Sequence, residues 1–156
     1  MKKKPLICIC IPTYNRAASL SRLLESIITQ KGFDDEVSIM INDGPSKDGT
    51  ESMVRGYQKK YPNIKYSRNP VAVGMLPAIL ESIDMSEGEY TWIVGSDDFM
   101  WNDALEIMTS ALKEKKPALA LCNRLAFRDI TECKTFEPKV RSVLSFAGFS
   151  DFGTYF

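Results

Sequence analysis

The chain has 156 residues, of which 44% are hydrophobic and 26% charged, and its formal net charge is zero. These values are typical of one globular domain, spanning 1–156, with a real hydrophobic core. The neutral charge argues against a nucleic-acid-binding protein, which normally carries a basic face. The absence of histidine removes most zinc sites. No apolar run approaches the ~20 residues that a membrane-spanning helix needs.

Strand-like and helix-like segments alternate along the chain. Short β-branched runs predict strands at 6–11, 36–41, 64–67, 89–94 and 118–122. Apolar residues spaced three and four apart predict helices at 20–32, 48–61, 74–85 and 105–116. Repeated strand–helix units favour an α/β fold in which a mostly parallel, doubly wound sheet carries helices on both faces.

Local signals predict where three of these elements begin or end. Pro12 is expected to stop the first strand, and residues 42–45 are expected to form a loop after the second. Residues 48–51 resemble a capping box in which Asp48 opens the second helix. Pro77 fits the first turn of the third helix better than its interior.

Cys8 and Cys10 alternate within the first predicted strand, so they should share one face of it. Neighbours on one strand are poorly placed to bond each other, and we therefore expect buried free thiols. Free thiols suit a reducing compartment such as the cytoplasm. The basic start at 2–4 is either a solvated terminus or a contact with a membrane surface.

Polar residues follow three of the predicted strands. The carboxyl ends of parallel strands meet at one edge of a sheet, where open α/β folds bind their ligands. This edge would combine the Arg16 cation with the adjacent acids Asp97 and Asp98. Two neighbouring carboxylates repel each other and need either a cation or a solvated site. Mg²⁺ held by one or two carboxylates and substrate phosphates fits the first alternative. The composition predicts a nucleotide-like anionic ligand.

Each loop has a simpler interpretation as well. Residues 13–16 could form only a turn and a helix start, and Asp43-Gly44 is a common turn dipeptide. The pair Asp97-Asp98 could be a solvated loop or could cap the next helix. The functional interpretation is favoured because all three loops fall at the same edge of the sheet.

Three segments, in this order and spacing, resemble a family-two glycosyltransferase of the GT-A fold. They are Ile9–Arg16 (ICIPTYNR), Ile41–Thr50 (INDGPSKDGT) and Gly88–Asp98 (GEYTWIVGSDD). The resemblance covers roughly 5–115, the expected donor-binding region. It implies an inverting, metal-assisted transfer of sugar from a nucleoside diphosphate sugar, by default a UDP-sugar, to a glycan or lipid-linked acceptor.

The resemblance also implies roles for individual residues. Asp43 would bind the nucleobase, Asp97 would face the ribose or sugar, and Asp98 would bind a divalent metal, Mg or Mn. Ser96 stands where many relatives have a further acid. The nucleotide pocket would be lined by residues of the first loop: Pro12, Thr13, Tyr14, Asn15 and Arg16.

Family members are usually much longer than this chain, so the resemblance implies a C-terminally truncated chain in which 116–156 begins the acceptor side. No catalytic base is identified. The aromatic segment 146–156 is expected to pack on the domain, against the missing part of a longer chain, or against a second copy in a homodimer. By location alone the candidate bases are Asp129, Glu132, Glu137 and Asp151.

The family resemblance places the protein in polysaccharide biosynthesis, in the cytoplasm, with peripheral membrane association left open. The alternative function is a nucleotide-binding module without turnover. A phosphoacceptor signalling domain also gathers acids at a sheet edge, but it normally places an acid pair after the first strand. This chain has Pro12-Thr13-Tyr14-Asn15 there, which argues against that class.

Overall fold

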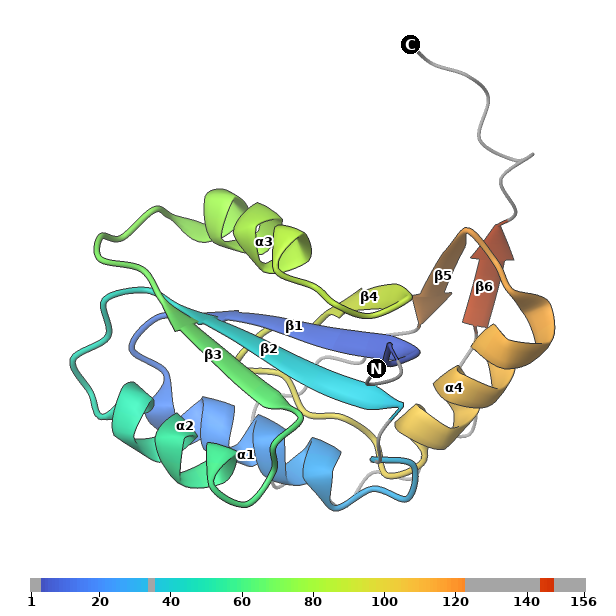
Figure 1. Cartoon of the computed structure of the whole chain (residues 1–156), viewed down its shortest axis with the longest axis horizontal. Coiled ribbons are helices and arrows are strands. Elements are labelled where there is room, and N and C mark those ends of the chain that lie inside the picture. The colour runs from blue at the N-terminus through green and yellow to red at the C-terminus, as the bar shows by residue number, and fades with distance from the viewer. Residues whose placement is uncertain (1–3, 34–35, 123–143, 148–156) are drawn as a thin grey trace, which may run out of the picture. The chain divides into compact units, whose positions relative to one another are not determined.

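The computed structural model describes residues 4–33, 36–122 and 144–147 (Figure 1). The chain forms two compact units, Met1–Thr109 and Ser110–Phe156. In the part of the chain that is described, no helix has both the length and the apolar character of a membrane span.

The first unit is built on a parallel four-stranded sheet in the order β3-β2-β1-β4. After β1 the chain adds β2 and β3 on one side, and it then crosses back to place β4 on the other side. The strand order therefore reverses between β1 and β4, and ligands of doubly wound folds bind at this switch point. The strands are β1 (Ile7–Thr13), β2 (Val37–Asp43), β3 (Ile64–Arg68) and β4 (Tyr90–Ile93).

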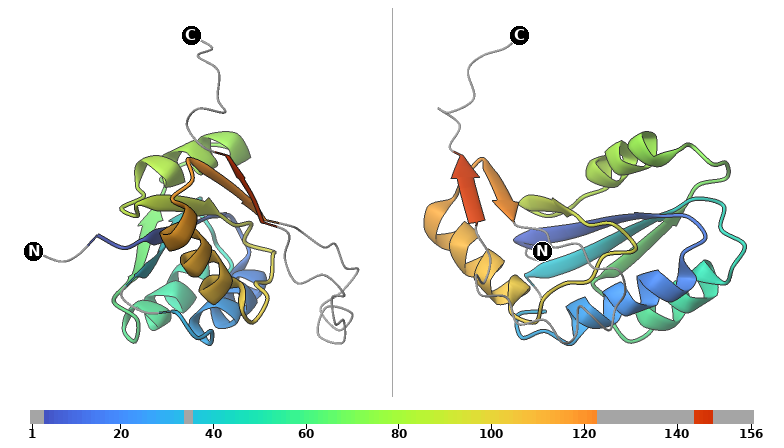
Figure 2. Two further views of the ribbon diagram at one scale, coloured as in Figure 1. Left: turned by 90° about the vertical axis from the view of Figure 1, so that its right-hand side faces the viewer. Right: turned by 180° about the vertical axis from the view of Figure 1, so that it is seen from behind.

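Helices cover both faces of this sheet, which confirms the predicted α/β class. Helices α1 (Ala17–Ile28) and α2 (Thr50–Gln58) lie together on one face, and α3 (Met75–Asp84) lies on the other (Figures 1 and 2). Pro77 is the third residue of α3 and so falls in its first turn, as predicted.

The two faces of β1 are buried against different kinds of side chain. Cys8 and Cys10 point to the α3 side, where the Cys10 thiol donates a hydrogen bond to the Ser82 carbonyl over 3.1 Å. Both cysteines are free and buried, as predicted, and the thiol contact between them together with burial raises the pKa of Cys10. The core on the opposite face is aliphatic, with fully buried Ile7, Ile9, Ile11, Leu20, Leu23, Leu24 and Ile27.

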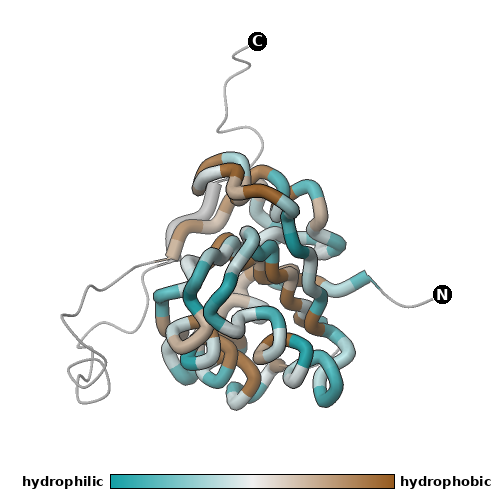
Figure 3. Tube along the Cα trace, turned by 90° about the vertical axis from the view of Figure 1, so that its left-hand side faces the viewer, coloured by the Kyte–Doolittle hydropathy of each residue, from teal (hydrophilic) through white to brown (hydrophobic). Residues whose placement is uncertain are grey.

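Helix α3 buries Ser82 and exposes several large apolar side chains. Ser82 is fully buried beside β1. The apolar character of the helix is visible in Figure 3. The exposed large hydrophobic residues of α3 and of the loop before it are Val71, Met75, Leu76, Leu80 and Ile83.

Two strands are longer than the sequence predicted. Strand β1 continues through Pro12 to Thr13, although proline cannot donate a ladder bond. Because Cys10 accepts from Val94 N–H on the β4 side, Pro12 faces that same side, beyond the last residue of β4. No ladder bond is lost there. Strand β2 likewise continues to Asp43, so the predicted loop begins later, at Gly44.

The second unit contains a separate antiparallel pair of strands, β5 (Leu119–Cys122) and β6 (Leu144–Ala147). The sequence predicted a strand at 118–122, which matches β5, but it did not predict β6. Helix α4 (Ala104–Lys115) precedes this pair. All four candidate bases, and residues 148–156 of the aromatic segment, lie outside the described residues.

Candidate functional site

Three loops leave the carboxyl edge of the parallel sheet. We call residues 14–16, after β1, the first loop, and residues 44–49, after β2, the second loop. Residues 94–98, after β4, form the third loop. The first and third loops follow the two strands between which the strand order reverses, so both lie at the switch point where a ligand is expected.

The first and second loops are joined by a regular series of hydrogen bonds. Gly44 N–H donates to the Thr13 carbonyl over 2.8 Å. Asn15 N–H donates to Ser46 Oγ over 2.7 Å, and Lys47 N–H donates to Asn15 Oδ1 over 2.8 Å. Asn15 adopts a left-handed backbone with φ of 51°, a conformation that asparagine tolerates better than most residues. The two loops therefore form one connected backbone surface.

Asp48 completes this connection at the start of two helices. Its Oδ2 accepts from Ala17 N–H over 2.8 Å, at the first residue of α1. Its Oδ1 accepts from the hydroxyl and the N–H of Thr50, over 2.6 and 3.2 Å, at the first residue of α2. The hydrogen bond from Ala17, followed by that from the Thr50 hydroxyl, lowers the pKa of Asp48.

The predicted capping box at 48–51 is wrong in detail. The residue at the N-cap of α2 is Gly49, with φ of 88° and no side-chain capping bond. Asp48 lies one position earlier and reaches across to α1 as well. The sequence could not show this second contact, because it depends on how the two loops meet in space.

Asp43, the predicted base-binding residue, is completely buried at the end of β2. Its Oδ1 accepts from the Ser46 hydroxyl over 2.5 Å, and its Oδ2 accepts from the Tyr66 hydroxyl over 2.7 Å. Burial, followed by the bond to Asp43, raises the pKa of Tyr66. An ionised carboxylate has about four acceptor positions, so Asp43 can accept a further bond once a neighbouring side chain moves aside.

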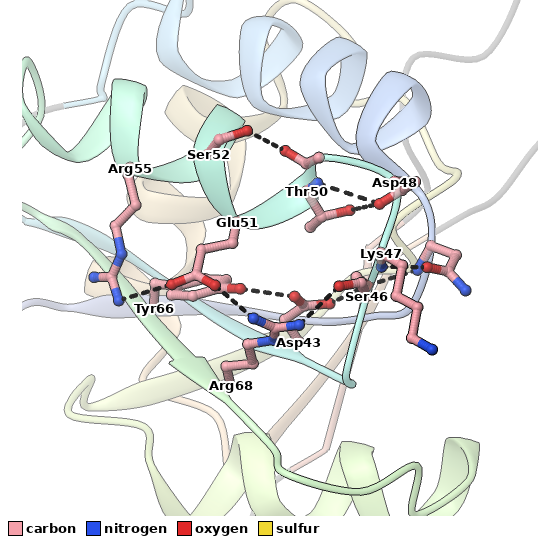
Figure 4. Close-up of polar contacts among 12 residues, drawn as sticks. Asp43, Ser46, Lys47, Asp48, Thr50, Glu51, Ser52, Arg55, Tyr66 and Arg68 are labelled. Carbon is pink, nitrogen blue, oxygen red and sulfur yellow. Dashed lines mark hydrogen bonds and ion pairs between the residues drawn. The ribbon is translucent and has the colours of Figure 1, made fainter.

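Sequence reasoning missed the side chains that surround Asp43 on the α2 side (Figure 4). Arg68 donates to Glu51 Oε2 over 2.7 Å and to the Ser46 carbonyl over 2.8 Å. The Arg55 guanidinium lies 4.9 Å from the centre of the Tyr66 ring. Both Tyr66 and Arg68 belong to β3, whose carboxyl end reaches the same edge of the sheet. Their position at the end of a predicted strand was the one feature of the sequence that could have pointed to them.

Two buried polar atoms at this edge lack a hydrogen-bond partner within the described part of the protein. They are Thr13 Oγ1 and Asn42 Oδ1. Thr13 is only 6% exposed and is the last residue of β1. Asn42 points to the other face, where its amide donates to Glu81 Oε2 and to the Ala78 carbonyl, each over 3.1 Å. Buried polar atoms without partners are rare and need an explanation, such as a ligand or water.

Tyr14 of the first loop lies over Gly44 of the second. A Cβ atom on Gly44 would come 2.8 Å from Tyr14 Cδ2, so a glycine is needed for this approach. The Tyr14 side chain remains 51% exposed. An exposed ring held at the site edge can stack against a flat ligand such as a nucleobase.

The acid pair of the third loop is gathered around Gly95. Asp98 Oδ2 accepts from Gly95 N–H over 3.0 Å. A Cβ atom on Gly95 would lie 2.9 Å from Asp98 Oδ2 and 3.2 Å from Asp97 Oδ1. The two carboxylates thus converge over a residue that has no side chain. Hard oxygen ligands in this arrangement fit a divalent ion that also takes phosphate oxygens, although no cluster of three or more ligand side chains exists among the described residues.

Comparison with known proteins decides the family. The sequence model described as "Glycosyl transferase family 2" matches residues 8–139, most of the chain. This chain belongs to glycosyl transferase family 2. Among named relatives, abequosyltransferase RfbV of Salmonella typhimurium is 41% identical over 120 residues, which cover 76% of this chain and 36% of RfbV. The poly(ribitol-phosphate) beta-glucosyltransferase of Bacillus spizizenii is 30% identical over 116 residues, covering 74% of this chain and 18% of that protein.

Several solved structures share the fold. TarS residues 1–349 of S. aureus, in complex with UDP-GlcNAc, superposes with a TM-score of 0.66 at 26% identity, covering 70% of this chain and 32% of that one. The mannosyltransferase PcManGT of Pyrobaculum calidifontis, in complex with GDP-Man and Mn²⁺, gives a TM-score of 0.65 at 24% identity, over 76% and 35% of the two chains. The chain spans about a third of the length of RfbV and of these structures.

Proposed function

We propose that this chain binds the donor of a glycosyltransferase reaction, a nucleoside diphosphate sugar, with a UDP-sugar as the first candidate. The convergence of Asp97 and Asp98 over Gly95, at the strand-order switch point, carries this proposal. TarS, a relative in fold and sequence, has been crystallised with UDP and with UDP-GlcNAc, which supports a uridine donor.

The nucleoside end of the donor would lie on the joined first and second loops. The exposed Tyr14 ring would stack on the base, and the unpartnered Thr13 hydroxyl would gain a hydrogen-bond partner. Asp43 would accept from the base or its ribose, and for this the Tyr66 or Ser46 side chain must move aside, because Asp43 is completely buried. Pro12, Asn15 and Arg16 would complete the wall of this pocket.

The diphosphate would lie towards the third loop. Asp98 would hold a divalent ion, Mg²⁺ or Mn²⁺, with Asp97 turned to the ribose or the sugar. When bound, such an ion supplies Lewis-acid stabilisation of the leaving diphosphate. Gly95 keeps the space that both carboxylates need, and Arg16 brings a positive charge towards the phosphates.

The acceptor would be a glycan or a lipid-linked sugar in polysaccharide assembly. Its hydroxyl would attack the anomeric carbon of the donor sugar, with inversion, as the bond from that carbon to the diphosphate breaks. The attacking hydroxyl must lose a proton, and a carboxylate base is the usual solution. RfbV and the Bacillus enzyme are both named as glycosyltransferases, which supports transfer as the reaction class. A homodimer and a peripheral membrane contact remain part of this proposal.

Titration of the chain with UDP, UDP-GlcNAc and GDP in the presence of Mn²⁺, followed by a transfer assay, tests this function. Tight binding of one diphosphate series supports a donor site. Binding with neither transfer nor donor hydrolysis would support the alternative of a nucleotide-binding module. If none of the nucleotides binds, the donor-site assignment is wrong.

A further inference from the structure

The carboxylate of Asp48 lies at the N-terminus of helix α1. The N-terminus of a helix carries free N–H groups and a partial positive charge, and it commonly binds a phosphate. Here the N-cap residue, Arg16, makes no side-chain capping bond. Instead the Asp48 carboxylate reaches over from the second loop and accepts from Ala17 N–H over 2.8 Å.

The same carboxylate also lies at the start of α2. Its other oxygen accepts from Thr50 N–H and from the Thr50 hydroxyl, and Thr50 is the first residue of that helix. The Asp48 carboxylate therefore lies at the N-termini, the positive ends, of two helices at once. Asp48 is exposed to solvent and lies in the second loop, which we propose as part of the donor-binding site.

In many doubly wound nucleotide-binding proteins the diphosphate binds at the helix that follows the first strand. In this chain a phosphate placed there would meet a fixed negative charge, and the repulsion over a few ångströms is strong enough to oppose binding. The diphosphate must then be neutralised elsewhere on the sheet edge. The acid pair of the third loop, whose carboxylates converge over Gly95, offers that place through a bound cation.

We propose that Asp48 acts as an internal substitute for phosphate, which excludes the diphosphate from the start of α1 and so makes donor binding depend on a divalent cation at Asp97 and Asp98. This inference rests on the proposed donor function. It makes Asp48 a positioning residue that determines the metal requirement, not a residue that touches the reacting atoms.

The test replaces Asp48 by asparagine, which keeps an acceptor for Ala17 N–H but removes the charge. The control, Asp84→Asn, removes the same charge from the C-terminal end of α3. Binding of UDP and of inorganic pyrophosphate is measured by calorimetry, with Mn²⁺ and with EDTA. We expect Asp48→Asn to bind pyrophosphate and UDP in EDTA at least about tenfold more tightly than the wild type and the control.

Unchanged or weaker binding in EDTA by a folded Asp48→Asn variant would overturn the proposal. The Asp48→Ser variant, whose short hydroxyl also caps helices, repeats the test if asparagine prevents folding. Pyrophosphate separates the two hypotheses, because it needs no nucleobase pocket. A gain in pyrophosphate binding by a chain that never binds UDP would keep the role of Asp48 and contradict only the nucleotide assignment.

Discussion

The Tyr66 hydroxyl donates a hydrogen bond to Asp43 Oδ2 over 2.7 Å, so a residue of β3 holds the carboxylate that we assign to the nucleobase. In the strand register Ile41 pairs with Tyr66 and Asp43 with Arg68. Tyr66 and Asp43 are therefore diagonal neighbours on one face of the sheet. The base and Tyr66 would compete for access to the same buried carboxylate.

The Tyr66→Phe variant tests this competition. Losing the hydroxyl leaves a buried carboxylate oxygen with one donor fewer, and we expect the free energy of unfolding to fall by about 1–3 kcal/mol. Binding of uridine should be retained or strengthened, because the oxygen is released. Urea denaturation and calorimetry measure the two effects. The control is Tyr57→Phe, whose hydroxyl contacts Ser21 and Glu25 near the surface; weaker uridine binding by Tyr66→Phe than by this control would exclude competition.

Replacing Asp43 by alanine should weaken nucleotide binding by about 1–3 kcal/mol, because a buried hydrogen bond to the ligand is lost. The same change leaves the Ser46 and Tyr66 hydroxyls without their acceptor. We therefore expect lower stability too, and binding must be compared at a temperature where the variant is folded. Equal nucleotide affinity of the folded variant and the wild type would remove Asp43 from the site.

The Gly95→Ala variant should damage the metal site while the fold survives. Its Cβ would come within 2.9 Å of Asp98 Oδ2 and 3.2 Å of Asp97 Oδ1, so the Asp98 carboxylate must shift and the Asp97 carboxylate must move slightly, which disturbs their convergence. We expect Mn²⁺-dependent UDP affinity to fall about tenfold or more, with binding of uridine unaffected.

Gly56→Ala is the matched control for this variant. A Cβ atom at Gly56 would meet nothing within 4 Å, and alanine should stabilise α2 by roughly 0.5–1 kcal/mol. Calorimetry and thermal melting compare the two variants. If Gly95→Ala retained the full Mn²⁺ effect on UDP, the assignment of the acid pair would be wrong.

Gly88 has a structural role in the approach of β4 to β1. A Cβ atom there would collide with Cys8 N, and would lie 2.6 Å from the Tyr90 carbonyl oxygen and 2.8 Å from Cys8 Cβ. Backbone atoms of two paired strands cannot give way cheaply. We expect Gly88→Ala to lower the free energy of unfolding by about 1–3 kcal/mol, measured by urea denaturation. A change as small as that of Gly56→Ala would contradict this packing.

The fold class was predictable because its signals are local. Buried β-branched runs and amphipathic spacing placed all the strands of the parallel sheet and helices α1 to α3 near their observed positions. The positions of Asp97, Asp98 and the first loop at the sheet edge follow from strand ends alone.

The network around these residues was not predictable from the sequence. Tyr66 reaches Asp43 only through the register of β3 on β2, and Asp48 reaches Ala17 only because the two loops are hydrogen-bonded to each other. Strand β6 pairs with β5, which lies more than twenty residues earlier. No periodic pattern in the sequence of β6 indicates that it pairs with β5. Contacts between distant segments leave no spacing signal along the chain.

A calorimetric comparison of UDP with uridine, each with Mn²⁺ and with EDTA, tests most directly whether the donor site depends on a metal. We expect EDTA to weaken UDP binding at least about tenfold, because the diphosphate is held through a cation at Asp97 and Asp98. Uridine, which binds only the first and second loops, should lose less than about twofold. Equal and small losses for both ligands, or no binding of UDP with Mn²⁺, would contradict a metal-dependent donor site in this chain.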